Sequence, residues 1–272
     1  FGMLVRHLQE ALDMPTLSVP TLPSSASRED VEQAAQTCRE QWSLPADGPI
    51  DGLGRMLERA GIVLTRLNED AAGVDAFSRF GPVSIVVLNP LKQSPSRTLL
   101  DMAHELGHGV MHRGLRTGTP ETERQADRFA AAFLLPQAGF RREFWAAGRL
   151  DWGHLFELKQ KWRTSVAMIV RRGFDLGLLD PATYRRACKY MYAQGWARTE
   201  PHEPEHEEPE LFRLALETLK RDAGETAEGM AAKLHWKITT FEEVAGLGGA
   251  LETPPRVLSL DLFRQKRQAA AP

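Results

Sequence analysis

The chain has 272 residues, of which 42% are hydrophobic and 26% are charged, and its formal net charge at pH 7 is −2. This composition is ordinary for a soluble globular protein, and the length allows a full core and a second small domain. The charge balance does not favour nucleic acid as a partner. No apolar run reaches transmembrane length and no charged-then-apolar leader opens the chain, so no membrane partner is expected.

Cys38 and Cys188 are the only cysteines. Two cysteines in a chain of this length indicate a reducing compartment and not a disulfide scaffold. We therefore expect a cytoplasmic protein.

The first 25 residues predict a helix and a linker. Residues 1–13 carry leucines at helical spacing, and the following stretch is rich in proline and serine. The helix has two interpretations: an ordinary N-terminal helix, or the end of a helix-turn-helix domain whose front lies outside the sequence.

Two helices and two strands are predicted after this linker. The helices are 29–42 and 49–60, the strands are 61–67 and 83–88, and residues 71–81 are expected to connect the strands. The second strand ends at Asn89-Pro90 and leads to Ser94-Pro95, where the serine can cap a helix and the proline can occupy its first position.

The helix that follows contains His104-Glu-Leu-Gly-His108. Histidines four residues apart project from one face of a helix and can share one metal ion, as in zinc peptidases. Glu105, between them, is the candidate general base for metal-assisted amide hydrolysis. The alternative is a surface helix with two solvated histidines, but apolar residues at helical spacing predict that this helix is anchored in a core.

A third metal ligand is expected from the helix over residues 121–135. Glu123 and Asp127 are four residues apart, and a catalytic zinc site needs three protein ligands and one open position. Glu123 fits the third ligand, and Asp127 can accept the N–H of a zinc histidine. Glu121 competes with Glu123 but has no carboxylate four residues later. The alternative for all three is a solvated, salt-bridged face.

His112 follows His104 by eight residues. On a continuous helix it lies about 12 Å along the axis from His104, too far to share the ion unless Gly109 ends the helix early. Two roles remain equally supported: His112 donates to the developing oxyanion, as a catalytic residue, or it caps the helix.

The strand over Val83–Asn89 is the candidate substrate-binding edge, with Val87 and Asn89 as its contact residues. Strand edges near the metal of zinc peptidases bind substrate backbone by strand addition. A plain core strand is the alternative.

With their flanking residues, these motifs resemble the ImmA/IrrE family of metallopeptidases. The resemblance covers roughly residues 30–250. It includes Arg39-Glu-Gln-Trp42, Leu57-Glu58 with Gly61-Ile62, Val74-Asp75-Ala76-Phe77-Ser78, the strand over 83–89, both ligand helices, and Leu176-Gly177-Leu178 with Gly195-Trp196. One departure is Thr98-Leu-Leu-Asp-Met102, where members often have Arg-Phe-Thr-Leu, and it affects packing and not ligation.

The resemblance implies a zinc-dependent, cytoplasmic, regulatory peptidase. Its implied partner is a helix-turn-helix repressor of a phage, a mobile element or a DNA-damage response. The similar subgroup carries this domain behind an XRE-type helix-turn-helix, which favours the second interpretation of residues 1–25. DNA binding is then expected only through such a missing or fused domain. A homodimer is one possible oligomeric state.

The remainder predicts helices and one linker. Residues 137–196 are expected to be helical. Residues 201–210 form an acidic, proline-rich linker, and short helices over 210–222, 225–235 and 239–247 predict a small C-terminal helical domain over 211–252. Residues 253–272 are predicted to be a poorly ordered tail.

We therefore expect an α+β fold, with a mostly helical, zincin-like metallopeptidase domain over 26–200 and a small antiparallel or mixed sheet. The expected function is zinc-dependent peptide hydrolysis. The rivals are a transcription regulator that senses an effector or partner without proteolysis, and a metal-dependent toxin or defence component. Glu105 favours the enzyme, because a structural zinc site needs no general base.

Overall fold

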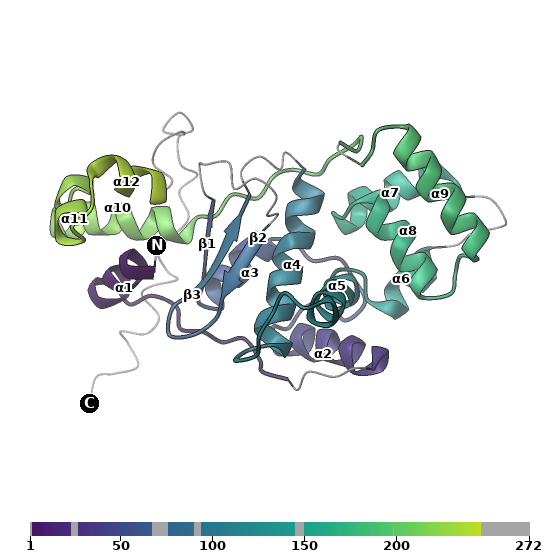
Figure 1. The fold of residues 1–272 in the computed structure, drawn as a ribbon, viewed down its shortest axis with the longest axis horizontal. Helices are drawn as coiled ribbons and strands as arrows, with labels where there is room; N and C mark the ends of the chain where they lie inside the picture. Colours follow the sequence, from purple (N-terminus) through teal and green to yellow (C-terminus); the bar gives the residue numbers. More distant parts are fainter. Residues whose placement is uncertain are drawn as a thin grey trace.

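The computed structural model describes residues 2–22, 27–66, 76–89, 94–144, 150–197 and 199–245. These residues form twelve helices and three strands (Figure 1). In chain order they are α1 (Gly2–Ala11), α2 (Arg28–Gln41), α3 (Leu53–Arg59), β1 (Ile62–Arg66), β2 (Ala76–Arg79), β3 (Ser84–Leu88), α4 (Pro95–Met111), α5 (Pro120–Leu134), α6 (Gln137–Glu143), α7 (Trp152–Trp162), α8 (Val166–Asp175), α9 (Pro181–Ala193), α10 (Leu211–Ala223), α11 (Ala227–Lys233) and α12 (Ile238–Val244). None of these helices is long and apolar enough to cross a bilayer. The fold is mostly helical with one small mixed sheet, as the sequence predicted; the predicted tail lies outside the described residues.

The sheet has the strand order β1-β3-β2. β1 pairs with β3 in parallel, and β2 pairs with β3 in antiparallel. The apolar runs in the sequence correctly predicted β1 and β3. Residues 71–81 were predicted to be a connection without regular structure, and this is wrong for residues 76–79, which form β2. Its four residues alternate between half-buried and exposed. Because Ser78 and Arg79 are polar, the strand has no apolar run that would predict it. Only the family resemblance at Phe77-Ser78 indicated a strand here; residues 71–75 lie outside the described part of the chain.

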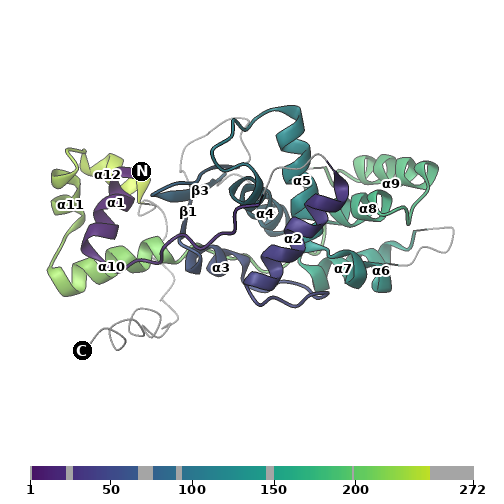
Figure 2. The same cartoon turned by 90° about the horizontal axis from the view of Figure 1, so that it is seen from below.

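Strands β1 and β3 are buried on both faces, which explains their apolar runs. Leu64 and Val86 belong to the main core, to which helices α2 to α9 also contribute. Val63, Ile85 and Val87 belong to a second core, formed with α1 and the C-terminal helices. Helix α1 and helices α10 to α12 thus cover one sheet face together, at the left in Figures 1 and 2.

Helices α6 to α9 lie on the other side of α5, at the right in both views. The predicted helical stretch over 137–196 is divided among them. Asp151, Ser165 and Asp180 begin three of the four, and each side chain accepts backbone N–H bonds from the first turn. Such caps replace the partners that the first N–H groups of a helix lack.

The acidic segment over residues 201–210 is extended, as predicted, and runs from α9 across the molecule to α10 (Figure 1). Its carboxylates, together with that of Glu200 just before it, also cap helices that are distant in the sequence. Glu200 accepts the N–H of Val166 at 2.7 Å, Glu203 that of Ser96 at 3.0 Å, and Glu207 that of Gly54 at 3.1 Å. Because anions are favoured at helix N-termini, these contacts fasten the segment to α8, α4 and α3.

A buried cation reinforces this attachment. Nζ of Lys159 lies 2.9 Å from Glu200 and 2.8 Å from Glu203, and the side chains of Lys159 and Glu200 are fully buried. The linker is therefore a structural part of the metallopeptidase-like region and not only a spacer.

Candidate metal centre

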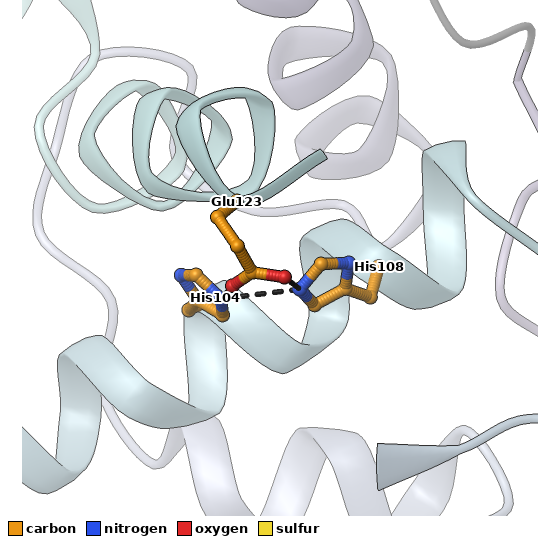
Figure 3. Close-up of side chains that lie close together, drawn as sticks. All are labelled: His104, His108 and Glu123. Atoms are coloured by element: carbon orange, nitrogen blue, oxygen red, sulfur yellow. Dashed lines mark hydrogen bonds and ion pairs between the residues drawn. The ribbon is translucent and has the colours of Figure 1, made fainter. Parts of the chain in front are cut away.

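Helix α4 carries the two candidate metal-binding histidines. It begins with Pro95 in the first turn, where the missing N–H of a proline costs no helix bond. The four-residue spacing puts His104 and His108 on one face, with their Nε2 atoms 3.1 Å apart (Figure 3). Apolar residues such as Leu106 lie in the main core and fix the rotation of the helix.

Helix α5 brings Glu123 to the same point. A capping box of Thr119 and Thr122 starts this helix and leaves Glu123 in its first turn. Oε2 of Glu123 lies 3.1 Å from Nε2 of His104, and Oε1 lies 3.4 Å from Nε2 of His108. One ligand atom from each residue lies within 4.8 Å of the others, so the three can hold one metal ion.

The separations fit zinc. Ligand atoms about 2.0–2.1 Å from a tetrahedral zinc ion lie about 3.3 Å from one another, close to the three distances seen here. A carboxylate and two neutral imidazole nitrogens converge with their lone pairs, an arrangement that a cation stabilises. Three protein ligands leave one position open, as in catalytic zinc sites.

Asp127 lies where the sequence predicted a partner for a zinc histidine. Its Oδ1 atom is 2.8 Å from Nδ1 of His104. An ionised carboxylate only accepts hydrogen bonds, so this contact places the imidazole proton on Nδ1 and leaves the lone pair of Nε2 facing Glu123.

His112 ends α4 as its C-cap, and Gly109 does not end the helix early. Nδ1 of His112 lies 3.0 Å from Nδ1 of His108, and Nε2 lies 2.8 Å from Oε1 of Gln125. Gln125 was not predicted from the sequence, because no local spacing relates it to His112. A buried polar residue within an apolar helix stripe was the available signal.

Glu121 does not reach the histidines. Its carboxylate accepts hydrogen bonds from Arg124 at 2.6 Å and from Nε2 of Gln125 at 3.1 Å. The structure therefore brings Glu123, and not Glu121, to the two histidines.

Electrostatics separates the two histidines. Burial is the largest single influence on His104 and opposes its charge, but the hydrogen bond to Asp127 and the charges of the nearby carboxylates together outweigh burial and raise the pKa of this imidazole. Burial and the neighbouring His104 lower the pKa of His108. A neutral His108 keeps the lone pair that a metal ligand needs.

Two glycines of α4 allow the neighbouring elements to approach the site. A Cβ atom at Gly107 would lie 3.0 Å from the ring of Phe129 on α5, and one at Gly109 would clash with the ring of Phe80, just after β2. The first close approach brings α5, and with it Glu123, to the histidines. The second brings β2 against α4.

Glu105 lies at the contact between α4 and β2. Its side chain is buried, and the hydroxyl of Ser78 donates to Oε2. Burial raises the pKa of Glu105, although Ser78 and His104 act in the opposite direction. A general base works best when its pKa is near the working pH, so the environment of Glu105 suits proton transfer.

A cavity of about 310 Å³ opens onto these groups. Its lining includes Glu105, His108 and Glu123 on one side, and Phe77 and Leu115 at its mouth. The last two are 49% and 55% exposed and present apolar surface to solvent. Metal ligands, base and apolar surface therefore share one cleft.

The predicted substrate-binding edge is not available on β3. Val87 pairs with Thr65 of β1 on one side and with Phe77 of β2 on the other, and β3 ends just before Asn89. The central place of β3 could not be read from the sequence, because strand order depends on the crossover. Within the described sheet, the free edge beside the cleft belongs to β2.

A His-Glu-x-x-His helix, a carboxylate from the next helix and a small mixed sheet define a metallopeptidase-like domain. Within that class, residues 57–173 form an IrrE N-terminal-like domain, Peptidase_M78, in agreement with the resemblance seen in the sequence.

A solved structure of a Mycobacterium tuberculosis transcriptional regulator is similar over 53% of this chain and 46% of that chain, with 17% identity and a TM-score of 0.35. The chain thus corresponds to less than half of that protein, and this likeness carries no functional argument. A search of curated proteins found no match.

Proposed function

We propose that this chain is a zinc-dependent endopeptidase that hydrolyses a peptide bond in a regulatory protein. The observation that carries the proposal is the position of Glu105. Its buried carboxylate lines the same cavity as His108 and Glu123, two of the three residues of the ligand set that His104 completes. A structural zinc site uses four protein ligands and needs no base beside them.

Each residue has a distinct role in the proposed reaction. His104, His108 and Glu123 hold Zn²⁺, which when bound polarises the scissile carbonyl and acidifies water. Glu105 accepts a proton from the attacking water and passes it to the leaving amine. The Ser78 hydroxyl holds the Glu105 carboxylate toward the cavity.

The substrate is expected to bind as an extended segment. The outer edge of β2 can accept such a segment by strand addition, beside Ser78 and the cleft. Phe77 and Leu115 would then contact its apolar side chains. The family resemblance supports a helix-turn-helix repressor of a stress, phage or mobile-element response as this substrate. The unpaired Cys38 and Cys188 support a cytoplasmic setting.

The test is incubation of the full chain with candidate helix-turn-helix repressors, with and without Zn²⁺, followed by intact mass measurement. The expected products are two fragments whose masses sum to that of the repressor plus one water. Glu105→Gln should keep zinc and fold while the rate falls about 10²- to 10⁴-fold.

The rival function is a regulator that senses an effector or partner without proteolysis. In cells, Glu105→Gln that regulates target genes like the wild type, together with His104→Ala that does not, would establish this rival. The zinc site would then be a scaffold or an effector pocket.

A further inference from the structure

A hydrogen-bonded chain of side chains runs from His108 through His112, which also lines the cleft, to helix α5. His112 and Gln125 are 2% and 3% exposed, so this chain passes through the protein interior. Its members are His108, His112, Gln125 and Glu121, taken from α4 and α5.

The far end of the chain fixes the direction of its hydrogen bonds. The Glu121 carboxylate also binds Arg124 and can only accept, so Gln125 donates to it through Nε2. The amide oxygen of Gln125 therefore faces His112 and accepts the proton of its Nε2 atom, at 2.8 Å.

The proton position on His112 also fixes which nitrogen donates in its hydrogen bond with the metal ligand His108. A neutral imidazole with its proton on Nε2 accepts through Nδ1. His112 can therefore only accept at Nδ1, and His108 must donate from its own Nδ1 across the 3.0 Å contact. This tautomer leaves Nε2 of His108 without a proton, directed at Glu123 and His104.

We propose that His112 and Gln125 are positioning residues that fix the tautomer and ring orientation of His108 and thereby set the affinity for zinc. This inference rests on the zinc site of the proposed function. It leaves His112 no ring nitrogen to donate to an oxyanion, because both are engaged within the protein.

The two zinc histidines are thus held by different chemistry. His104 contacts the carboxylate of Asp127, whose side chain is 73% exposed and remains solvated as an ion. His108 contacts a buried chain, where a lone charge would be costly, and neutral imidazole and amide groups supply the hydrogen bonds instead. At the far end of the chain, the amide of Gln125 donates to Glu121, which forms an exposed ion pair with Arg124.

The first test is zinc affinity of the full chain, measured by competition with a colorimetric chelator. Gln125→Met keeps the size of the side chain but has no acceptor oxygen, and should weaken zinc binding roughly 10- to 100-fold. The control, Gln137→Met on the exposed start of α6, should bind like the wild type.

Wild-type affinity in a folded Gln125→Met protein would overturn the positioning role and leave the proposed function intact. A wild-type chain that binds no zinc would overturn both.

The second test needs no variant. Long-range ¹⁵N–¹H correlation spectra of the zinc-loaded chain, labelled at histidine, report which ring nitrogens carry protons. We expect the ring proton of His112 on Nε2 and that of His108 on Nδ1. A proton on Nδ1 of His112 would contradict the proposal even if every variant misfolds.

Discussion

Glu58, near the end of α3, accepts the backbone N–H of Leu211 at 2.9 Å, although 153 residues separate them. Leu211 is the first residue of α10, and the N–H of Glu210 donates to the same carboxylate at 3.0 Å. The metallopeptidase-like region thus caps the first C-terminal helix, while the linker caps α3, α4 and α8 in return.

This contact predicts how stability depends on pH. Burial raises the pKa of Glu58 from an ordinary 4.5 to about 7. The folded state holds this proton more tightly than the unfolded state, so the contribution to stability is complete below pH 4.5 and is lost as the pH rises through about 7. Glu58→Gln keeps an acceptor oxygen without the charge. Its free energy of unfolding relative to the wild type should therefore increase by on the order of 1–3 kcal/mol between pH 5 and pH 8.

Urea unfolding in the presence of a chelator measures this difference, because the metal site then contributes equally to both proteins. If the difference in free energy of unfolding between Glu58→Gln and the wild type is the same at pH 5 and pH 8, Glu58 does not titrate on unfolding.

The buried cation of the linker predicts a larger effect. Lys159→Met leaves the fully buried Glu200 without its compensating charge, and should lower the free energy of unfolding by about 3–5 kcal/mol. Lys161 is the matched control on the same helix: its side chain is 52% exposed beside Glu143, and Lys161→Met should cost less than about 1 kcal/mol. Equal losses in urea unfolding would mean that Lys159 is not the residue that fastens the linker.

Local sequence was sufficient for the ligand helices. The spacing of His104 and His108 fixes a shared face, and the apolar stripe fixes which side of α4 is buried. The same reasoning placed Glu123 and Asp127 together on α5. Helical periodicity and capping residues depend on only a few neighbouring residues, so they can be predicted without knowledge of the tertiary fold.

What the sequence could not supply depends on contacts between distant elements. β2 is a short, half-polar edge strand whose role comes from its place beside β3 and α4. Gln125 matters only because α5 packs close to α4, and the capping role of Glu203 depends on α4, more than 100 residues earlier. No spacing rule relates such pairs.

The two candidate carboxylates of α5 give a direct test of the ligand set. Glu123→Ala removes a ligand atom and should weaken zinc binding by more than the roughly 10- to 100-fold loss typical of a supporting partner. Glu121→Ala removes only the distant anchor of Gln125 and should have the smaller effect. Elemental analysis and chelator competition give both values. The reverse order would assign the ligand to Glu121.

Asp127 should affect zinc through its hydrogen bond and not through its charge. Asp127→Ala removes the acceptor at Nδ1 of His104 and should lower zinc affinity roughly 10-fold or more. Asp127→Asn keeps an acceptor oxygen and should retain most of the affinity. If the two variants lose affinity equally, the contribution of Asp127 is electrostatic. Unchanged affinity in Asp127→Ala would return this residue to a solvated helix face.

The apolar mouth of the cleft should determine how well substrate binds. Phe77 lines the cavity from the β2 edge and is 49% exposed, so a substrate side chain can cover the open half of its ring. That burial is worth about 1–1.5 kcal/mol, and Phe77→Ala should therefore raise KM about 10-fold with little change in kcat. Tyr192, 79% exposed on α9, is the control, since it is not part of the cavity lining. Initial rates of repressor cleavage measure both. A Phe77→Ala enzyme with wild-type KM would show that substrate does not contact the β2 edge at this residue.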